Sequence, residues 1–283
     1  ERYGTDFVAT WGGVANTARI AASLGARVQL LTGLGDDPNS EMCRRELADW
    51  GIDLTPSPIN HGWALPVTMS QARGTERAMT TVETVLPDPL PEPDLDGIDA
   101  VVTHVSVPAD TWLHEAADAG IPVIADHGFE EGYDPGLLDA VSGCTCYTPN
   151  AAEAMQLTCT GDPVRAARAL AEHVPVVVVT CGGEGIIGVD SRTSEEARIP
   201  AVAINPVNTT GAGDATLAGL AWSWGWQVSL ARKLDVAALV GAIVTSRPHG
   251  TADPLTPEEL LAWVPCDRER FGFLGELLGD SSD

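Results

Sequence analysis

A short segment near residue 210 combines two glycines and a carboxylate with the start of an apolar helix. It reads Asn208-Thr-Thr-Gly-Ala-Gly-Asp-Ala215 and precedes an apolar stretch that runs to Trp224. Gly211 and Gly213 let the backbone turn sharply and present N–H groups beside a helix N-terminus, which attracts anions. Asp214 could accept a proton from a hydroxyl that attacks a phosphoryl group there. Phosphoryl transfer and an ordinary acidic first turn explain this spacing equally well.

The elements that would position this segment alternate between short β-branched runs and amphipathic helical stretches. Buried strands are predicted at residues 28–32, 100–105, 121–125 and 176–180. Helices are predicted at residues 15–24, 40–50, 110–119, 151–157, 163–173, 213–224, 230–246 and 257–263. Alternating strands and helices form parallel βαβ units. We therefore predict an α/β fold with a doubly wound, mostly parallel sheet flanked by helices.

One region departs from this alternation. Residues 63–85 are rich in Thr, Val and Met, with Arg73-Gly74 as a plausible turn, which predicts a β-hairpin inserted between α/β units. Insertions of this kind often close over a site, so we interpret residues 61–86 as a small β lid. The proline-rich segment 87–93 would return the chain to the core as a stiff connector.

The charge and hydrophobicity of the sequence argue against some classes of binding partner. The 283 residues include 16 basic and 40 acidic ones, for a formal net charge of −24, which would repel nucleic acid. No apolar run approaches the length of a membrane helix, and no basic segment leads into an apolar one at the start. We expect a cytoplasmic protein that binds neither nucleic acid nor membrane.

Four motifs follow one another along the chain, the first of them in two parts. Gly12-Gly-Val-Ala-Asn-Thr-Ala18 opens a predicted helix and is followed by Gly33-Leu-Gly-Asp-Asp37. Asn150-Ala-Ala-Glu153 and Thr180-Cys-Gly-Gly-Glu-Gly185 come next, before the segment from Thr209 to Ala215. In order and spacing, these motifs resemble the signatures of the ribokinase-like (PfkB) carbohydrate kinases over nearly the whole chain.

The resemblance implies a single ribokinase-like domain over residues 1–283 that phosphorylates a hydroxyl of a small sugar or sugar acid with ATP. Asp214 would be the general base, and the backbone of Gly211, Ala212 and Gly213 would form the anion hole.

The resemblance also implies a nucleotide side and a sugar side. Asn150 and Glu153 would organise Mg²⁺ and the nucleotide phosphates, with Glu153 acting on Mg²⁺ through water. A helix cap made by Asn150 and Glu153 is the structural alternative. The remaining carried-over residues are Thr180, Gly182 and Gly185 on the nucleotide side, and Gly12, Gly13 and Asn16 facing the sugar.

The sequence departs from the family pattern at three positions after residue 200. Asn208 stands where the signature begins with Asp, a residue that helps to hold a monovalent cation in many relatives. Thr216 replaces the closing Phe, a change in packing, and the loop from Thr245 to Gly250 carries an extra residue. K⁺ activation is therefore left open.

The fourth departure lies at the start. Family members open with a strand and a sugar-binding Asp well before the Gly-Gly motif, whereas Gly12 comes here almost at once. Because a parallel sheet without a central strand would have open edges, we expect that residues preceding Glu1 supply this strand.

Other enzyme classes lack their motifs in this sequence. There is no Gly-x-x-x-x-Gly-Lys loop, no pair of His-Arg-Asp and Asp-Phe-Gly motifs, and no Gly-x-Gly-x-x-Gly near the start, which argues against P-loop enzymes, protein kinases and dehydrogenases.

Three alternatives remain open within the resemblance. Trp63 and Met69 could form a base slot in a nucleoside kinase, and Arg73 and Arg77 could bind a phosphosugar. Loss of the signature Asp at Asn208 favours an inactive sugar- or nucleotide-binding regulator, while the retained base argues against one. Further candidates are the strand-end residues His104, Asp126 and His127. A homodimer formed through the lid edge is also possible.

Overall fold

The computed structural model describes residues 10–73, 76–82, 85–105, 107, 109–127, 134 and 136–279. The chain forms two compact units. One unit combines Glu1–Ala26 with Leu95–Asp283, and the other comprises Arg27–Asp94.

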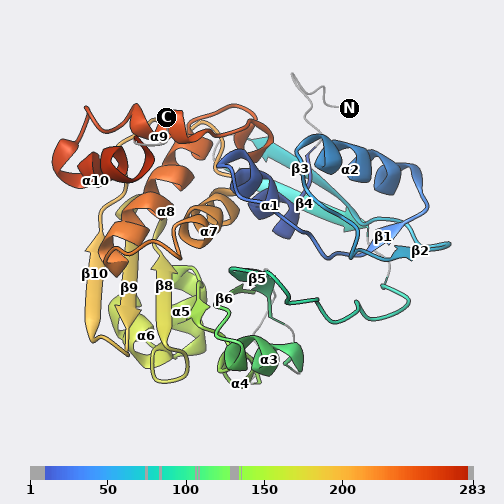
Figure 1. Ribbon diagram of the computed structural model, residues 1–283, viewed down its shortest axis with the longest axis horizontal. Coiled ribbons are helices and arrows are strands. Elements are labelled where there is room, and N and C mark those ends of the chain that lie inside the picture. Colours follow the sequence, from blue (N-terminus) through green and yellow to red (C-terminus); the bar gives the residue numbers. More distant parts are fainter. Residues whose placement is uncertain are drawn as a thin grey trace. The chain divides into compact units, whose positions relative to one another are not determined.

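The larger unit is built on a six-stranded sheet (Figure 1). In order across the sheet, the strands are β10 (Glu195–Ile199), β9 (Ile186–Asp190), β8 (Val176–Thr180), β7 (Cys146–Tyr147), β6 (Val123–Asp126) and β5 (Val101–His104). Strands β5 to β8 are parallel, and β9 is antiparallel to both of its neighbours. The carboxyl ends of the four parallel strands therefore meet at one edge, where ligands bind in folds of this kind.

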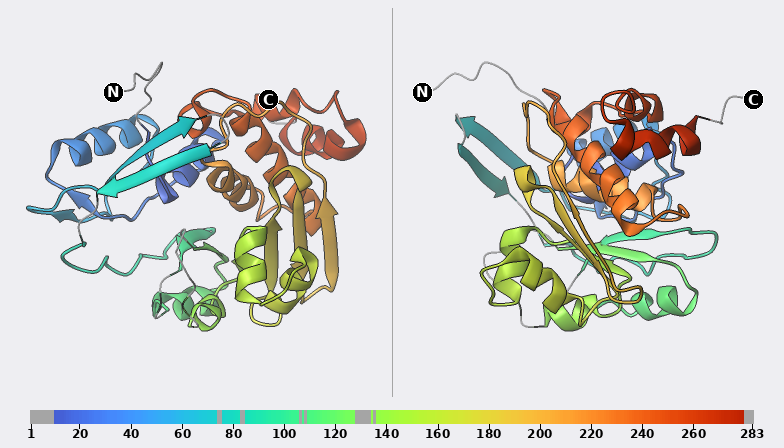
Figure 2. Two further views of the ribbon diagram at one scale, coloured as in Figure 1. Left: turned by 180° about the vertical axis from the view of Figure 1, so that it is seen from behind. Right: turned by 90° about the vertical axis from the view of Figure 1, so that its left-hand side faces the viewer.

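Helices cover both faces of this sheet (Figure 2). Strand β8 shows why, because Val176 and Val178 belong to one core cluster whereas Val177 and Val179 belong to the other. The first cluster packs against α1 (Val14–Ser23), α7 (Ala212–Trp222), α8 (Leu230–Thr245), α9 (Pro257–Leu261) and α10 (Arg268–Leu278). The second packs against α3 (Trp112–Asp118), α4 (Leu137–Val141), α5 (Ala151–Leu157) and α6 (Pro163–Leu170).

Helices α7 and α8 pack closely because small residues lie at their contact. A Cβ atom on Gly219 would lie 2.9 Å from the Cβ of Val240, and one on Gly241 would collide with the Thr216 hydroxyl. That hydroxyl donates to the Ala212 carbonyl at 2.8 Å, within α7 itself. The start of α7 is thus packed closely against α8.

The smaller unit contains α2 (Pro38–Asp49) and two short sheets. Strand β1 (Leu34–Gly35) pairs in parallel with β2 (Ile59–Asn60), and β3 (Val67–Arg73) pairs antiparallel with β4 (Glu76–Val82). The β3–β4 pair lies where we predicted the hairpin, although Gly74 of its expected turn is outside the described residues. Its action as a lid stays a prediction.

The fold class is confirmed, and the predicted helices agree with the observed ones to within three residues at either end. The predicted strand at 28–32 is wrong, because only Gln29 forms an isolated bridge, to Asp53. The patterning did not reveal β1, β2, β7, β9, β10, α4 or α10. Among the described helices, none is both long enough and apolar enough to cross a membrane.

Candidate active site at the start of α7

Asp214 lies in the first turn of α7, three residues after the cap residue Gly211. Gly211 is the N-terminal cap and has φ of 77°, a left-handed conformation that glycine adopts without strain. The Asn16 side-chain amide donates to Asp214 Oδ2 at 2.8 Å, and the Thr17 hydroxyl donates to the Asp214 carbonyl at 3.3 Å. Burial raises the pKa of Asp214 above its usual value, while the Asn16 bond and His104 oppose this. A carboxylate in this environment is a stronger base than one in water.

Asn16 links three segments that are far apart in sequence. Asn16 is 4% exposed, and its Oδ1 accepts a hydrogen bond of 2.8 Å from the Thr251 hydroxyl. The Thr251 methyl group in turn packs on Gly211, where a Cβ atom would lie 2.7 Å away. Asn16 therefore positions Asp214 in this structure. Whether it also contacts a sugar, as the resemblance implies, stays a prediction.

The backbone around Gly213 is suited to an anion. The first intrahelical bond of α7 runs from Ala215 N to the Gly211 carbonyl at 2.9 Å, so the N–H groups of Gly213 and Asp214 precede the helical ladder. Gly213 is exposed, and a Cβ atom there would meet nothing within 4 Å. Open N–H groups at the positive end of an 11-residue helix can stabilise a phosphoryl group.

A cleft of about 100 Å³ adjoins this helix start at the carboxyl edge of the sheet. Four of the predicted site residues line it, namely Asn150, Glu153, Thr180 and Gly213. The other lining residues are Asp126, Thr148, Val178, Thr216, Leu217 and Leu220. The other predicted site residues are not among those that line this cleft, namely Gly12, Gly13, Asn16, Gly182, Gly185, Gly211, Ala212 and Asp214.

Asn150 and Glu153 form a capping box at the start of α5. Glu153 N donates to Asn150 Oδ1 at 3.0 Å, and Asn150 N donates to Glu153 Oε2 at 2.7 Å. The helix cap, which was the structural alternative, is therefore present with both of its hydrogen bonds. It does not exclude a role in binding, because both side chains also line the cleft and a carboxylate oxygen can accept more than one partner.

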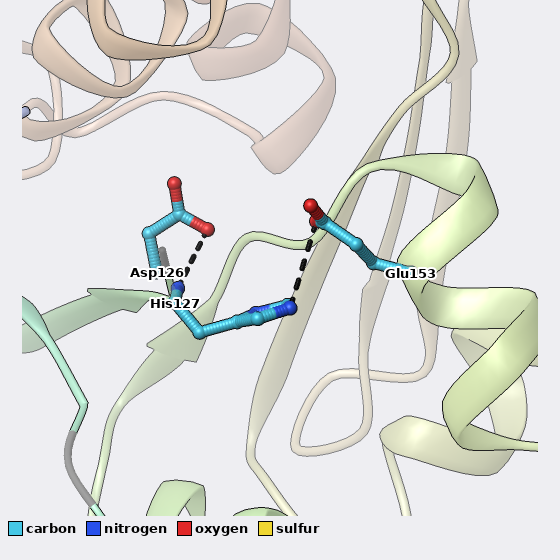
Figure 3. A group of neighbouring side chains, drawn as sticks. All are labelled: Asp126, His127 and Glu153. Atoms are coloured by element: carbon cyan, nitrogen blue, oxygen red, sulfur yellow. Dashed lines mark hydrogen bonds and ion pairs between the residues drawn. The ribbon is translucent and has the colours of Figure 1, made fainter. Parts of the chain in front are cut away.

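Asp126 and His127 at the end of β6 lie close to Glu153 in the first turn of α5, and Asp126 and Glu153 line the cleft (Figure 3). Their ligand atoms lie within 4.8 Å of one another, and His127 Nε2 is 3.8 Å from Glu153 Oε2. His127 N donates to Asp126 Oδ1 at 2.8 Å, and the Tyr147 hydroxyl lies 2.6 Å from His127 Nδ1, which fixes the orientation of the ring. Burial lowers the pKa of His127 to about 4, so this imidazole is neutral at pH 7.

The acidic groups of this cluster fit a divalent cation. Burial is the main cause that raises the pKa of Asp126 to about 7, and the carboxylates of Glu153 and Asp214 raise it further. Burial also raises the pKa of Glu153. A hard cation such as Mg²⁺ prefers carboxylate oxygens and water and would favour their ionised forms. Asp126 and Glu153 are the residues that would hold it.

His104 approaches the same site from the end of β5. A Cβ atom on Gly13 would lie 3.6 Å from the imidazole Cε1 of His104, which places this ring beside the Gly-Gly turn before α1. Burial lowers the pKa of His104, and the Asp214 carboxylate opposes that shift. Three strand-end candidates, His104, Asp126 and His127, thus converge on one site. Position after a strand was the only signal for them, and none marked Thr251.

Two of the three glycines in the β8–β9 turn, Gly182 and Gly185, have a structural role. Gly185 has φ of 100°, and a Cβ atom there would collide with the Ile199 carbonyl oxygen. Gly182 has φ of 54° and opens a short 3₁₀ turn, Gly182–Glu184. Their contact with a nucleotide stays a prediction. Gly12 and Gly13 precede α1, and Gly13, with φ of 55°, is the residue that caps this helix.

The sequence of this chain is similar to those of known carbohydrate kinases. The profile of the pfkB family carbohydrate kinases matches residues 2–257. The deoxyribokinase of Salmonella typhi is 30% identical over 224 residues, which cover 71% of this chain and 70% of that protein.

Solved structures support the same fold. A putative ribokinase from Agrobacterium tumefaciens superposes with a TM-score of 0.82 at 19% identity, over 92% of this chain and 87% of that one. A double mutant of fructokinase from Vibrio cholerae O395, in a form with fructose, ADP and potassium ion bound, gives a TM-score of 0.75 at 20% identity over 89% of each chain. At these identities, the two structures show the fold alone.

Proposed function

The chain belongs to the pfkB family of carbohydrate kinases, and from this premise we propose that it transfers the γ-phosphoryl group of ATP to a hydroxyl of a small sugar or sugar acid. The observation that carries the proposal is the position of Asp214. Its carboxylate is half-buried, hydrogen-bonded by Asn16, and set beside N–H groups at the start of α7. A base and an anion site thus lie within one helical turn.

In the proposed reaction, the Asp214 carboxylate takes the proton of the attacking hydroxyl. A bond forms between that oxygen and the γ-phosphorus, the bond from this phosphorus to the β-phosphate oxygen breaks, and ADP leaves. The backbone N–H groups around Gly213 stabilise the negative charge on the phosphoryl group in transit. The hydrogen bond from Asn16 holds the carboxylate in the orientation that the hydroxyl requires.

The nucleotide phosphates are proposed to occupy the cleft beside Asn150 and Thr180. No lysine or arginine is among the described residues that line this cleft, so the phosphate charge must be countered in another way. The helix N-terminus supplies part of this compensation. A bound Mg²⁺ would supply the rest by neutralising phosphate charge, with Asp126 and Glu153 holding it directly or through water.

The proposal is tested by ADP release from MgATP with a panel of sugars, sugar acids, phosphosugars and nucleosides. We expect turnover with one sugar class, and the acceptor that turns over identifies the substrate group. Turnover confined to nucleosides would instead identify a nucleoside kinase. An absence of turnover across the panel, in a folded protein that binds ATP, would contradict the proposal and favour a regulator.

His104 is proposed to contact the substrate beside Asp214. A neutral imidazole can both donate to and accept from sugar hydroxyls, and this ring lies next to the Gly-Gly turn that is expected to face the sugar. His104→Ala should therefore raise KM for the sugar by about 10- to 100-fold, because one or two hydrogen bonds are lost. The KM for ATP should change little.

Steady-state kinetics with each substrate varied in turn provide the measurement. The matched control is His114→Ala, since His114 is exposed on α3, away from the cleft-lining residues. Equal increases in both KM values for His104→Ala would show that the ring supports the fold and does not select the sugar.

A further inference from the structure

Asn208 lies in the loop before α7, and both atoms of its amide are hydrogen-bonded to backbone. Its Oδ1 accepts from Thr210 N at 3.0 Å, and its Nδ2 donates to the Pro248 carbonyl at 3.1 Å. An N–H group can only donate, and a carbonyl oxygen can only accept. These two partners therefore determine which amide atom faces which loop.

The amide joins the loop that precedes α7 to the loop that follows α8. The N–H groups of Val207 and Asn208 both donate to the Thr245 carbonyl, at 2.8 and 3.0 Å. Gly250 has φ of 56°, and a Cβ atom there would lie 3.4 Å from Asn208 Nδ2 and 3.4 Å from the Thr210 carbonyl oxygen. The NH₂ group of Asn208 thus lies at the Pro248 carbonyl and beside Gly250, in the loop that leads into the turn with the proposed anion hole.

The resemblance implies that the corresponding aspartate helps to hold a monovalent cation in many relatives. An aspartate at position 208 in this structure would place a carboxylate oxygen against the Pro248 carbonyl oxygen, at the separation now occupied by a hydrogen bond. Two acceptors facing each other repel unless a cation lies between them. With asparagine, the side-chain N–H group places a partial positive charge against the Pro248 carbonyl oxygen. The residues present therefore do not fit a cation between position 208 and Pro248.

We infer that the Asn208 side-chain amide takes the place of the monovalent cation, so that this enzyme holds its anion-hole loop and turns over without K⁺. The inference rests on the proposed kinase function. Its physical basis is a hydrogen bond between neutral groups that needs no ion to be formed. Compared with aspartate, asparagine also carries one negative charge fewer, three residues before the proposed anion hole.

The wild-type enzyme provides the first test. Turnover is measured in KCl, NaCl and N-methyl-D-glucamine chloride at equal ionic strength, because a chain of net charge −24 responds to salt in general through screening. We expect kcat/KM to agree within about twofold among the three salts. A specific requirement for K⁺ would overturn the inference.

Asn208→Asp provides the second test. In N-methyl-D-glucamine chloride, its kcat should fall by about tenfold or more, because the hydrogen bond to Pro248 is replaced by facing acceptors. K⁺ should restore turnover, and it should raise the Tm of this variant but not that of the wild type. The matched control is Asn205→Asp, which adds the same charge three residues earlier at an exposed position. It should show neither effect.

The two measurements separate this inference from the kinase proposal. Thermal unfolding reports on the cation even if no acceptor supports turnover, so absent activity contradicts only the kinase proposal. A Tm of the wild-type protein that rises with K⁺ more than with Na⁺ would overturn the inference by itself. An Asn208→Asp variant indifferent to K⁺ in both Tm and turnover would also overturn it.

Discussion

Asp214→Asn should lower kcat by about 10²- to 10⁴-fold and leave the affinity for ATP largely unchanged. Asparagine has nearly the same shape, and its Oδ1 can still accept the hydrogen bond from Asn16 that the carboxylate accepts now. The variant loses only the basicity that takes the proton from the attacking hydroxyl. Steady-state kinetics at saturating substrates measure kcat, and titration calorimetry with MgATP measures the affinity.

Asp235→Asn is the matched control. Asp235 is also a buried carboxylate whose pKa is raised by burial, but it pairs with Arg270 at 2.6 Å and with Arg232 at 3.4 Å, and no residue of this group lines the cleft. We expect this control to lower the free energy of unfolding while kcat stays near the wild-type value. Wild-type turnover in Asp214→Asn would rule out Asp214 as the base.

Features formed by residues that are adjacent in sequence could be predicted. The glycine turn, the start of α7 and the carboxylate in its first turn all lie within eight residues, from Asn208 to Ala215. The capping box of Asn150 and Glu153, which the spacing indicated as the structural alternative, is equally local and is present in the structure. Local backbone chemistry determines such elements, so one stretch of sequence is sufficient to recognise them.

Features that depend on distant partners could not be predicted. The hydrogen bonds that join Asn16 to Asp214 and Thr251 span 198 and 235 residues of chain. Strand β7 has only two residues and is stabilised by its neighbours β6 and β8, so no periodicity marks it. The stretch at 28–32 has strong β propensity but pairs only at Gln29, because propensity does not decide which strand finds a partner.

The electrostatics of the site depend both on local sequence and on contacts between residues far apart in the chain. Asp126, Glu153 and Asp214 come from three different elements, and the pKa of each carboxyl is raised mainly by burial. A fold that gathers acidic groups at a phosphate site needs cationic compensation. On the proposed function, we therefore expect the Asp126–Glu153 pair to favour a divalent cation, and an additional carboxylate at position 208 to be unfavourable without an ion of its own.

Asn16→Asp should shift the acid limb of the kcat/KM profile to higher pH by about one unit or more. The new carboxylate would replace an N–H donor 2.8 Å from Asp214 Oδ2, and two carboxylates at that distance cannot both ionise easily. The pKa of Asp214 is already raised by burial, so a further increase leaves a smaller fraction of the base ionised at neutral pH. We expect kcat/KM at pH 7 to fall by about 10- to 100-fold and to recover partly as pH rises.

The other ionisable groups that act on Asp214 are His104 and Asp126, and neither is changed in this variant. Thr251→Val is the matched control. It removes the hydroxyl that donates to Asn16 Oδ1 at 2.8 Å but leaves the Asn16–Asp214 bond in place. That control should lower kcat without moving the acid limb. If the acid limb of Asn16→Asp coincided with that of the wild type, the ionisation of Asp214 would not govern the rate, and the assignment of the base to this carboxylate would fail.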